Sequence, residues 1–175
     1  GKTFAHKNKI KNIKFVNADI FDDVFENEVF DFIWSNGVLH HTRDPSQAFD
    51  IISKYLKKNG YILVGLYNKI GRLRTIFRRL LYKIFGKSVI HLLDPTVRNL
   101  KQDNDLQIKS WIRDQYEHPV ESLHTLDEVL VWFKKNNIEF VNSIPSSDFI
   151  NNYGSNLFKK SKKGSYLSRF FSQVS

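Results

Sequence analysis

Residues 30–45, with the sequence FDFIWSNGVLHHTRDP, constrain the fold of this chain more strongly than any other stretch. Residues 30–34 are nearly all apolar, which is typical of a parallel strand covered on both faces. Ser35-Asn36-Gly37 interrupts that run, and Asp44-Pro45 has the order of a helix N-cap followed by a first-turn proline. Open α/β sheets bind small molecules at the carboxyl ends of their strands, so the sequence predicts a ligand site at this turn.

A helix and a second strand are predicted next. Apolar residues recur at helical spacing over residues 45–58, and Asn59-Gly60 is typical of a helix end. Residues 61–67 then form a second apolar run. Strand, helix and strand within residues 30–67 have the size of a βαβ crossover. The predicted fold class is therefore α/β with parallel strands.

Further elements are predicted on both sides of this unit. A strand over residues 10–16 would lead into Asn17-Ala18-Asp19 and present the Asp19 carboxylate at its carboxyl end. Thr125 and Glu128 have the spacing of a capping box, and a last strand is predicted over residues 138–144.

The domain organisation follows from these elements. We expect a core over residues 1–69, a helical insertion or lid over residues 70–124, a return to the core over residues 125–148, and a basic, mobile tail over residues 149–175. The insertion opens with a basic amphipathic helix over residues 70–85.

Composition narrows the class of protein. The chain has 175 residues, of which 41% are hydrophobic and none is Cys, so disulfides and thiolate metal sites are excluded and a cytoplasmic location is favoured. Its longest apolar run is far shorter than the roughly 20 residues of a bilayer span. It begins Gly-Lys-Thr-Phe and contains no Met, so we expect that it is cut from a longer protein.

Three stretches carry a resemblance to a known family. The Asp19 region, FDFIWSNGVLHH and YLKKNGYILVGLYN together resemble the second half of a class I S-adenosylmethionine-dependent methyltransferase of the type-11 group, and residues 111–145 are similar to the tail of one bacterial branch of it. The resemblance implies a Rossmann-like fold in which residues 13–16, 30–35 and 61–67 are the third, fourth and fifth strands. The first two strands, with the glycine-rich turn that holds the cofactor, would be absent. The chain as given is therefore expected to be an inactive fragment that does not measurably bind S-adenosyl-L-methionine alone.

The resemblance also assigns site residues and a reaction. It implies cofactor contacts at Asp19, Ile20, Ser35, Asn36 and Gly37, with Asp19 accepting a hydrogen bond from the adenine amino group. Alternatively, Asp19 only bonds nearby backbone amides at a strand end. Base-modifying members often carry Asn/Asp-Pro-Pro-Tyr after the fourth strand, and this chain does not. This argues against a base-modifying enzyme, and the Leu39-His40-His41 sequence is similar to members that methylate an oxygen or carbon atom of a small molecule, which is the expected reaction.

His40 and His41 are the candidate catalytic residues. An imidazole titrates near neutrality, so either could accept a proton from the acceptor; alternatively the pair is a solvated turn at a helix entry. We expect no metal site, because adjacent His side chains diverge and methyl transfer from a sulfonium requires no metal.

Four residues are candidates for binding the acceptor. Tyr67 ends the predicted strand at 61–67 and Asn68 follows it, whereas Tyr116 and His118 lie in the insertion. Alternatively, Tyr116 packs the insertion onto the core and the polar groups cap helices.

Two rival functions remain open. One is a non-catalytic binding or scaffold domain with the methyltransferase fold. The other is RNA binding through the basic stretch at residues 72–87, which lacks the interleaved exposed aromatic residues that base stacking requires. The same basic helix could instead contact an anionic acceptor or an acidic membrane surface, or could be only a solvated helix face.

Overall fold

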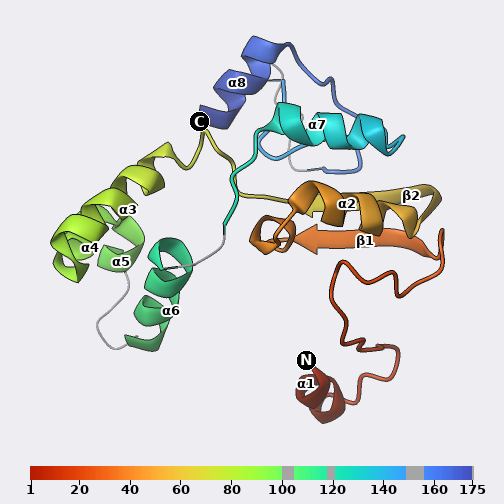
Figure 1. Cartoon of the computed structure of the whole chain (residues 1–175), viewed down its shortest axis with the longest axis horizontal. Helices are drawn as coiled ribbons and strands as arrows, with labels where there is room; N and C mark the ends of the chain where they lie inside the picture. Colours follow the sequence, from red (N-terminus) through yellow and green to blue (C-terminus); the bar gives the residue numbers. More distant parts are fainter. Residues whose placement is uncertain (100–104, 118–120, 149–155, 175) are drawn as a thin grey trace.

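A small parallel sheet forms the centre of the fold. The computed structural model describes residues 1–99, 105–117, 121–148 and 156–174. Strands β1 (Phe30–Asn36) and β2 (Leu56–Gly65) pair in parallel, and η1 (Leu39–His41) and α2 (Pro45–Lys54) connect them (Figure 1). The predicted βαβ unit and the mixed α/β class are confirmed.

The predicted start of α2 is also confirmed. The Asp44 carboxylate accepts a hydrogen bond from the backbone N–H of Gln47 at 2.9 Å, and Pro45 opens the first turn, where its missing N–H costs nothing. This cap fixes where the chain leaves the turn after β1.

The end of α2 differs from the prediction. The helix stops at Lys54 rather than at residue 58, and β2 begins at Leu56 rather than at residue 61. The backbone N–H groups of Val29 and Phe30 both donate to the Tyr55 carbonyl, which draws the chain into the sheet early. The pairing then jumps from Leu56 to Tyr61, so residues 57–60 bulge out of the register.

One face of β1 is covered and the other is open. Successive strand side chains point to opposite faces, and Ser35 is buried on the covered face. On the opposite face Phe32 is 44% exposed and Trp34 is 62% exposed. The expectation that this strand is covered on both faces is therefore wrong for the described part of the chain.

Helix α7 (Leu126–Lys135) completes the core beside the sheet. Its capping box is present as predicted, with Thr125 and Glu128 bonding each other's backbone N–H groups. Phe49 of α2 is fully buried and stacks on Phe133 with ring centroids 5.5 Å apart. Burial of these apolar rings holds α2 and α7 together. The core cluster consists of Leu39, Ala48, Phe49 and Trp132, with partly buried neighbours from the strands.

Two predicted strands are not strands in the structure. Residues 13–16 are exposed and, among the described residues, pair with no strand, so their backbone gains no ladder; they follow helix α1 (Lys2–Lys7). Residues 138–144 bury Phe140 but form no ladder, although the Val141 carbonyl accepts a hydrogen bond from the Ser161 N–H at 2.8 Å. An apolar run alone does not make a strand without a neighbour.

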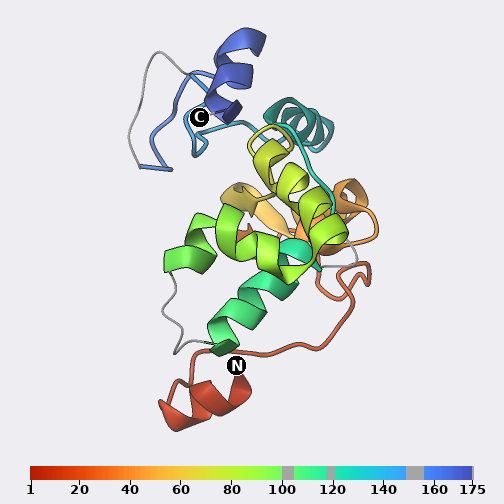
Figure 2. The ribbon, with the colours of Figure 1, turned by 90° about the vertical axis from the view of Figure 1, so that its left-hand side faces the viewer.

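A second group of helices lies beyond the carboxyl end of β1 (Figures 1 and 2). It has its own buried cluster, which includes Ile90, Val97 and Ile112. The basic helix predicted from residue 70 begins at Leu73. No described helix, here or elsewhere, is long and apolar enough to cross a membrane. The group comprises α3 (Leu73–Phe85), α4 (Lys87–Leu93), α5 (Pro95–Asn99) and α6 (Asp105–Tyr116).

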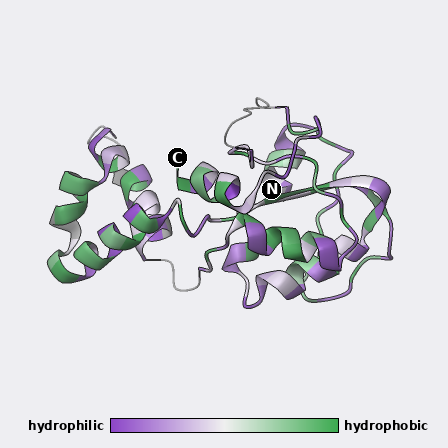
Figure 3. Cartoon of the chain, turned by 90° about the horizontal axis from the view of Figure 1, so that it is seen from above, coloured by the Kyte–Doolittle hydropathy of each residue, from purple (hydrophilic) through white to green (hydrophobic). Residues whose placement is uncertain are grey.

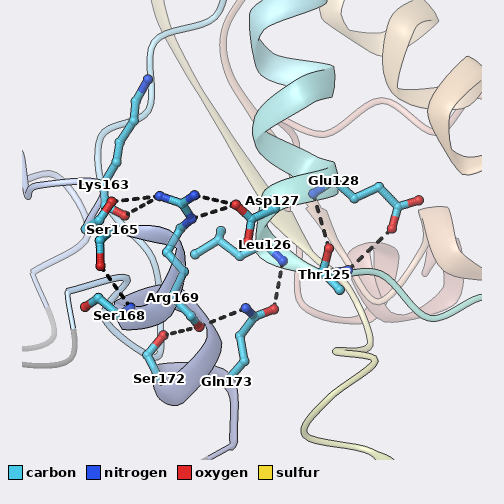
Figure 4. Close-up of polar contacts among 11 residues, drawn as sticks. Thr125, Leu126, Asp127, Glu128, Lys163, Ser165, Ser168, Arg169, Ser172 and Gln173 are labelled. Carbon is cyan, nitrogen blue, oxygen red and sulfur yellow. Dashed lines mark hydrogen bonds and ion pairs between the residues drawn. The ribbon is translucent and has the colours of Figure 1, made fainter.

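The C-terminal region differs from the expected mobile tail. Residues 166–174 form helix α8 (Tyr166–Val174), and residues 149–155 lie outside the described part. Figure 4 shows how α8 meets α7: the Arg169 guanidinium bonds the Asp127 carboxylate at 2.8 Å, and the Gln173 amide oxygen accepts from the Leu126 N–H at 2.8 Å. The Gln173 contact also satisfies an orphan backbone donor in the first turn of α7, the Leu126 N–H.

Packing of Phe49 should dominate the stability of the βαβ unit. Phe49→Ala is expected to lower the free energy of unfolding by about 3–5 kcal/mol, because it removes a fully buried ring. Phe77→Ala, at a side chain that is 61% exposed, should change it by less than about 1 kcal/mol. Urea unfolding measures both; equal losses would show that α2 is not packed as described.

Candidate functional site

The turn after β1 is open to solvent. Gly37 has a φ of +75°, a left-handed conformation that favours glycine, and a Cβ added there would meet nothing within 4 Å. Its N–H donates to the Gly65 carbonyl at 3.0 Å. A Cβ on Gly65 would lie 1.9 Å from the Asn36 Oδ1 atom, so Gly65 must be glycine for the Asn36 side chain to lie across β2. Sequence reasoning missed this role of Gly65.

His40 is buried directly behind this turn. It is 1% exposed, and among the described residues neither ring nitrogen has a hydrogen-bond partner. Its ring centroid lies 4.0 Å from that of Tyr67 and 4.2 Å from that of His41. Burial, followed by the neighbouring His41, lowers the pKa of His40 from 6.5 to about 4. His40 is therefore neutral at pH 7 and retains hydrogen-bonding capacity that the described protein does not use.

A buried ionic cluster supports the far side of Tyr67. The Arg72 guanidinium lies 3.6 Å above the Tyr67 ring. Glu121, with a side chain only 3% exposed, bonds Arg72 at 3.0 Å and Arg79 at 2.6 Å. His40, Tyr67 and Arg72 thus form one stack that ends on a buried carboxylate. Sequence reasoning missed Glu121 and considered Arg72 only as a contact for an external partner.

The chain after Glu121 also borders the site. The Ser122 N–H donates to the His40 carbonyl at 2.9 Å, which fixes the backbone of the candidate catalytic residue. The Ser122 hydroxyl lies 2.8 Å from His124 Nε2, and Glu128 lies 3.1 Å from His124 Nδ1. The structure therefore provides a second, nearly buried imidazole that sequence reasoning did not identify.

The Asn68 side chain forms hydrogen bonds within the protein. Its Oδ1 accepts hydrogen bonds from the N–H groups of Ile70 and Gly71 at 2.9 and 2.8 Å, and its Nδ2 donates to the Gln173 side chain at 2.8 Å. This residue shapes the loop after β2 and anchors α8, which favours a structural role.

Asp19 and Ile20 lie on the segment that precedes β1. Asp19 Oδ1 accepts a hydrogen bond from the Phe21 N–H at 2.9 Å, which is the local contact that the sequence left open as an alternative. Ile20 packs against the cluster that contains Leu39 and Phe49. The segment is thereby held against the βαβ unit without being a strand.

Tyr116 lies outside the site. It is 7% exposed in the buried cluster of the second helix group, and its hydroxyl donates to Asp94 at 2.7 Å. Burial and the Asp94 carboxylate raise its pKa to about 12. This position favours the packing alternative. His118, proposed as its partner in the acceptor site, lies outside the described residues.

A groove of about 1170 Å³ runs along β2 and residues 138–145. Five sequence-predicted residues line it, whereas Asp19, Ile20, Ser35, His41 and Tyr116 do not. Within the described part of the chain, no three His, Asp or Glu side chains gather closely enough to hold a metal ion. The five lining residues are Asn36, Gly37, His40, Tyr67 and Asn68.

Comparison with known proteins identifies the family. A family model described as a methyltransferase domain matches residues 2–137. The chain belongs to this methyltransferase family. The predicted resemblance to class I S-adenosylmethionine-dependent methyltransferases is therefore confirmed, and members of the family generally use that cofactor.

Two similar proteins cover only parts of this methyltransferase chain. Phosphoethanolamine N-methyltransferase 2 of Caenorhabditis elegans is 31% identical over 64 residues, which are 37% of this chain and 15% of that protein. The crystal structure of the YcgJ protein from Bacillus subtilis matches with a TM-score of 0.48 and 21% identity, over 77% of this chain and 45% of that one. The chain thus spans less than half the length of either.

The buried neutral His40 predicts a specific pH dependence of stability. Because its pKa is about 4 in the folded protein and 6.5 ordinarily, the unfolded chain binds the proton first as the pH falls. Neutral His40 contributes roughly 3 kcal/mol to the free energy of unfolding above pH 6.5, and this contribution is lost as the pH falls toward 4.

Urea unfolding between those two pH values measures this loss. His40→Phe should flatten the dependence, whereas His6→Gln, at an exposed histidine of α1, should preserve it. Identical slopes for all three proteins would contradict the burial of a neutral imidazole at position 40.

Proposed function

We propose that this protein transfers the methyl group of S-adenosyl-L-methionine to an oxygen or carbon atom of a small-molecule acceptor, at the carboxyl end of β1. One observation carries the proposal. In a chain of the methyltransferase family, a buried imidazole with no described hydrogen-bond partner lines a groove beside an open glycine turn. An unpaired buried polar group is costly unless a ligand or water satisfies it.

The residues around the turn fit the cofactor. Gly37 leaves space that a Cβ would otherwise fill, and the Asp19 carboxylate is exposed and has acceptor capacity beyond its one local bond. We infer that Asp19 and Ile20 hold the adenine end and that Ser35, Asn36 and Gly37 border the rest. When bound, the cofactor supplies an electrophilic methyl group on a positively charged sulfonium.

A neutral His40 suits a site for a cationic reactant. A protonated imidazole would repel the sulfonium charge, and burial keeps His40 uncharged at pH 7. With a pKa of about 4, His40 is a weak base, so its contribution is to accept a hydrogen bond and orient the acceptor. Adjacent His41 is the candidate that takes the proton when the acceptor is a hydroxyl.

The neighbouring residues define the rest of the site. Tyr67 holds one face of His40, and Asn68 shapes the loop beside it. RNA is a less suitable acceptor, because Arg72 and Arg79 are both bonded to Glu121, which neutralises one of their two charges within the protein. A small molecule in the cytoplasm remains the proposed partner.

A nitrogen acceptor is the second candidate. The name of the C. elegans relative describes methylation of the amine of phosphoethanolamine, and that protein shares 31% identity with this chain over 64 residues. A neutral His40 could orient an amine as readily as a hydroxyl. A non-catalytic binding or scaffold domain is the remaining rival.

A labelled-methyl assay tests the proposal in a version of the protein preceded by the family's glycine-rich turn. With methyl-labelled cofactor and a cell extract, label should enter the small-molecule fraction. His40→Asn should lower kcat by about 10²-fold or more, while His6→Asn should leave it unchanged. Label confined to RNA would exclude the small-molecule acceptor, and the absence of any transfer would favour the scaffold alternative.

A further inference from the structure

Helix α3 presents its apolar side to solvent. Five of its six exposed large apolar side chains follow helical spacing and form one stripe, which we name the α3 stripe; the sixth, Phe85, is the last residue of the helix and lies outside the stripe. Figure 3 shows hydrophobic positions, coloured green, along the helices of this group. The members and their exposed fractions are Leu73 (60%), Ile76 (41%), Phe77 (61%), Leu80 (55%) and Ile84 (63%).

The polar side of α3 faces the protein. Arg79 bonds buried Glu121 at 2.6 Å and also donates to the Gln115 carbonyl of α6. The Tyr82 hydroxyl donates to Glu117 at 2.5 Å, and the Tyr82 ring packs against that of Tyr116 at 5.6 Å. Rotating α3 to bury its stripe would leave the Glu121 carboxylate buried without one of its two guanidinium partners, which is costly. The outward orientation is therefore fixed by the internal ion pairs.

Exposed basic side chains border the α3 stripe. By helical spacing Arg74 lies on one side of it and Lys83 on the other, and both are exposed. Residues 73–85 contain no Asp or Glu. A stripe of this kind, apolar in the middle and basic at its rims, matches the chemistry of an interfacial helix: apolar groups enter the acyl boundary and long cationic side chains reach the headgroups.

We propose that α3 binds the surface of a bilayer that contains anionic lipids, with the α3 stripe inserted and Arg74 and Lys83 at the phosphates. Membrane contact was one option that the sequence left for this basic helix. Because the polar side of α3 faces the protein, the α3 stripe is the side of the helix that can insert. A second copy of the chain fits less well, because pairing two stripes would bring basic rims against basic rims. The proposal does not depend on the chemistry at His40.

Vesicle flotation tests the proposal with the purified protein. It should partition onto vesicles that contain phosphatidylglycerol and much less onto pure phosphatidylcholine. Phe77→Ser with Leu80→Ser should abolish partitioning, because both residues belong to the inserted stripe. Arg74→Gln with Lys83→Gln should weaken it roughly 30-fold, at about fivefold for each charge.

Two matched control variants distinguish the effect of the α3 stripe from the effect of removing any exposed charge or any exposed apolar group. Lys11→Gln with Lys14→Gln removes the same charge at exposed positions far along the chain, and Val131→Ser with Leu106→Ser removes exposed apolar groups from α7 and α6. Both control pairs should partition like the unmodified protein. The proposal would be overturned if the unmodified protein did not partition onto vesicles, or if the control pairs reduced partitioning as much as the stripe variants do. It would also be overturned if the protein bound no vesicles and light scattering showed a dimer that Phe77→Ser with Leu80→Ser dissociates.

Discussion

A buried carboxylate, Glu121, joins the two parts of this structure. It lies between the guanidinium groups of Arg72 and Arg79, and a buried carboxylate is tolerated only when it is paired in this way. One partner, Arg72, covers the ring of Tyr67, which in turn packs on His40. The other partner, Arg79, sets the rotation of α3. Glu121 therefore positions both Arg72, which supports the wall of the candidate site, and the α3 stripe, which faces outward.

The sequence was sufficient to predict those structural features that depend on residues close together in the chain. The Asp44 cap, the capping box at Thr125 and the strand from Phe30 depend on residues within one turn or one short apolar run, and all were predicted. A strand forms only where another strand lies beside it, and a local apolar run does not show whether that neighbour exists. The strands predicted over residues 13–16 and 138–144 are therefore wrong. The early start of β2 arises from bonds between Tyr55 and residues 29–30, a contact that no local pattern shows.

The same distinction applies to the site. Residues that directly follow a strand end, such as Gly37 and Tyr67, were predicted and line the groove. Glu121 was missed because its partners lie 49 and 42 residues away in sequence. Tyr116 was a candidate for the acceptor site because it lies in the inserted region beside His118, yet the Asp94 carboxylate satisfies its hydroxyl within a buried cluster. No sequence signal distinguishes these two uses of a tyrosine.

The proposed chemistry requires the cofactor to bind at the turn after β1. An NMR titration of isotope-labelled protein, preceded by the family's glycine-rich turn, with S-adenosylhomocysteine tests it most directly. The backbone signals of Asp19, Asn36, Gly37 and His40 should shift on binding, while those of α5 remain unchanged. Shifts that are confined to residues 138–145 or to the second helix group, with the turn after β1 unaffected, would contradict it.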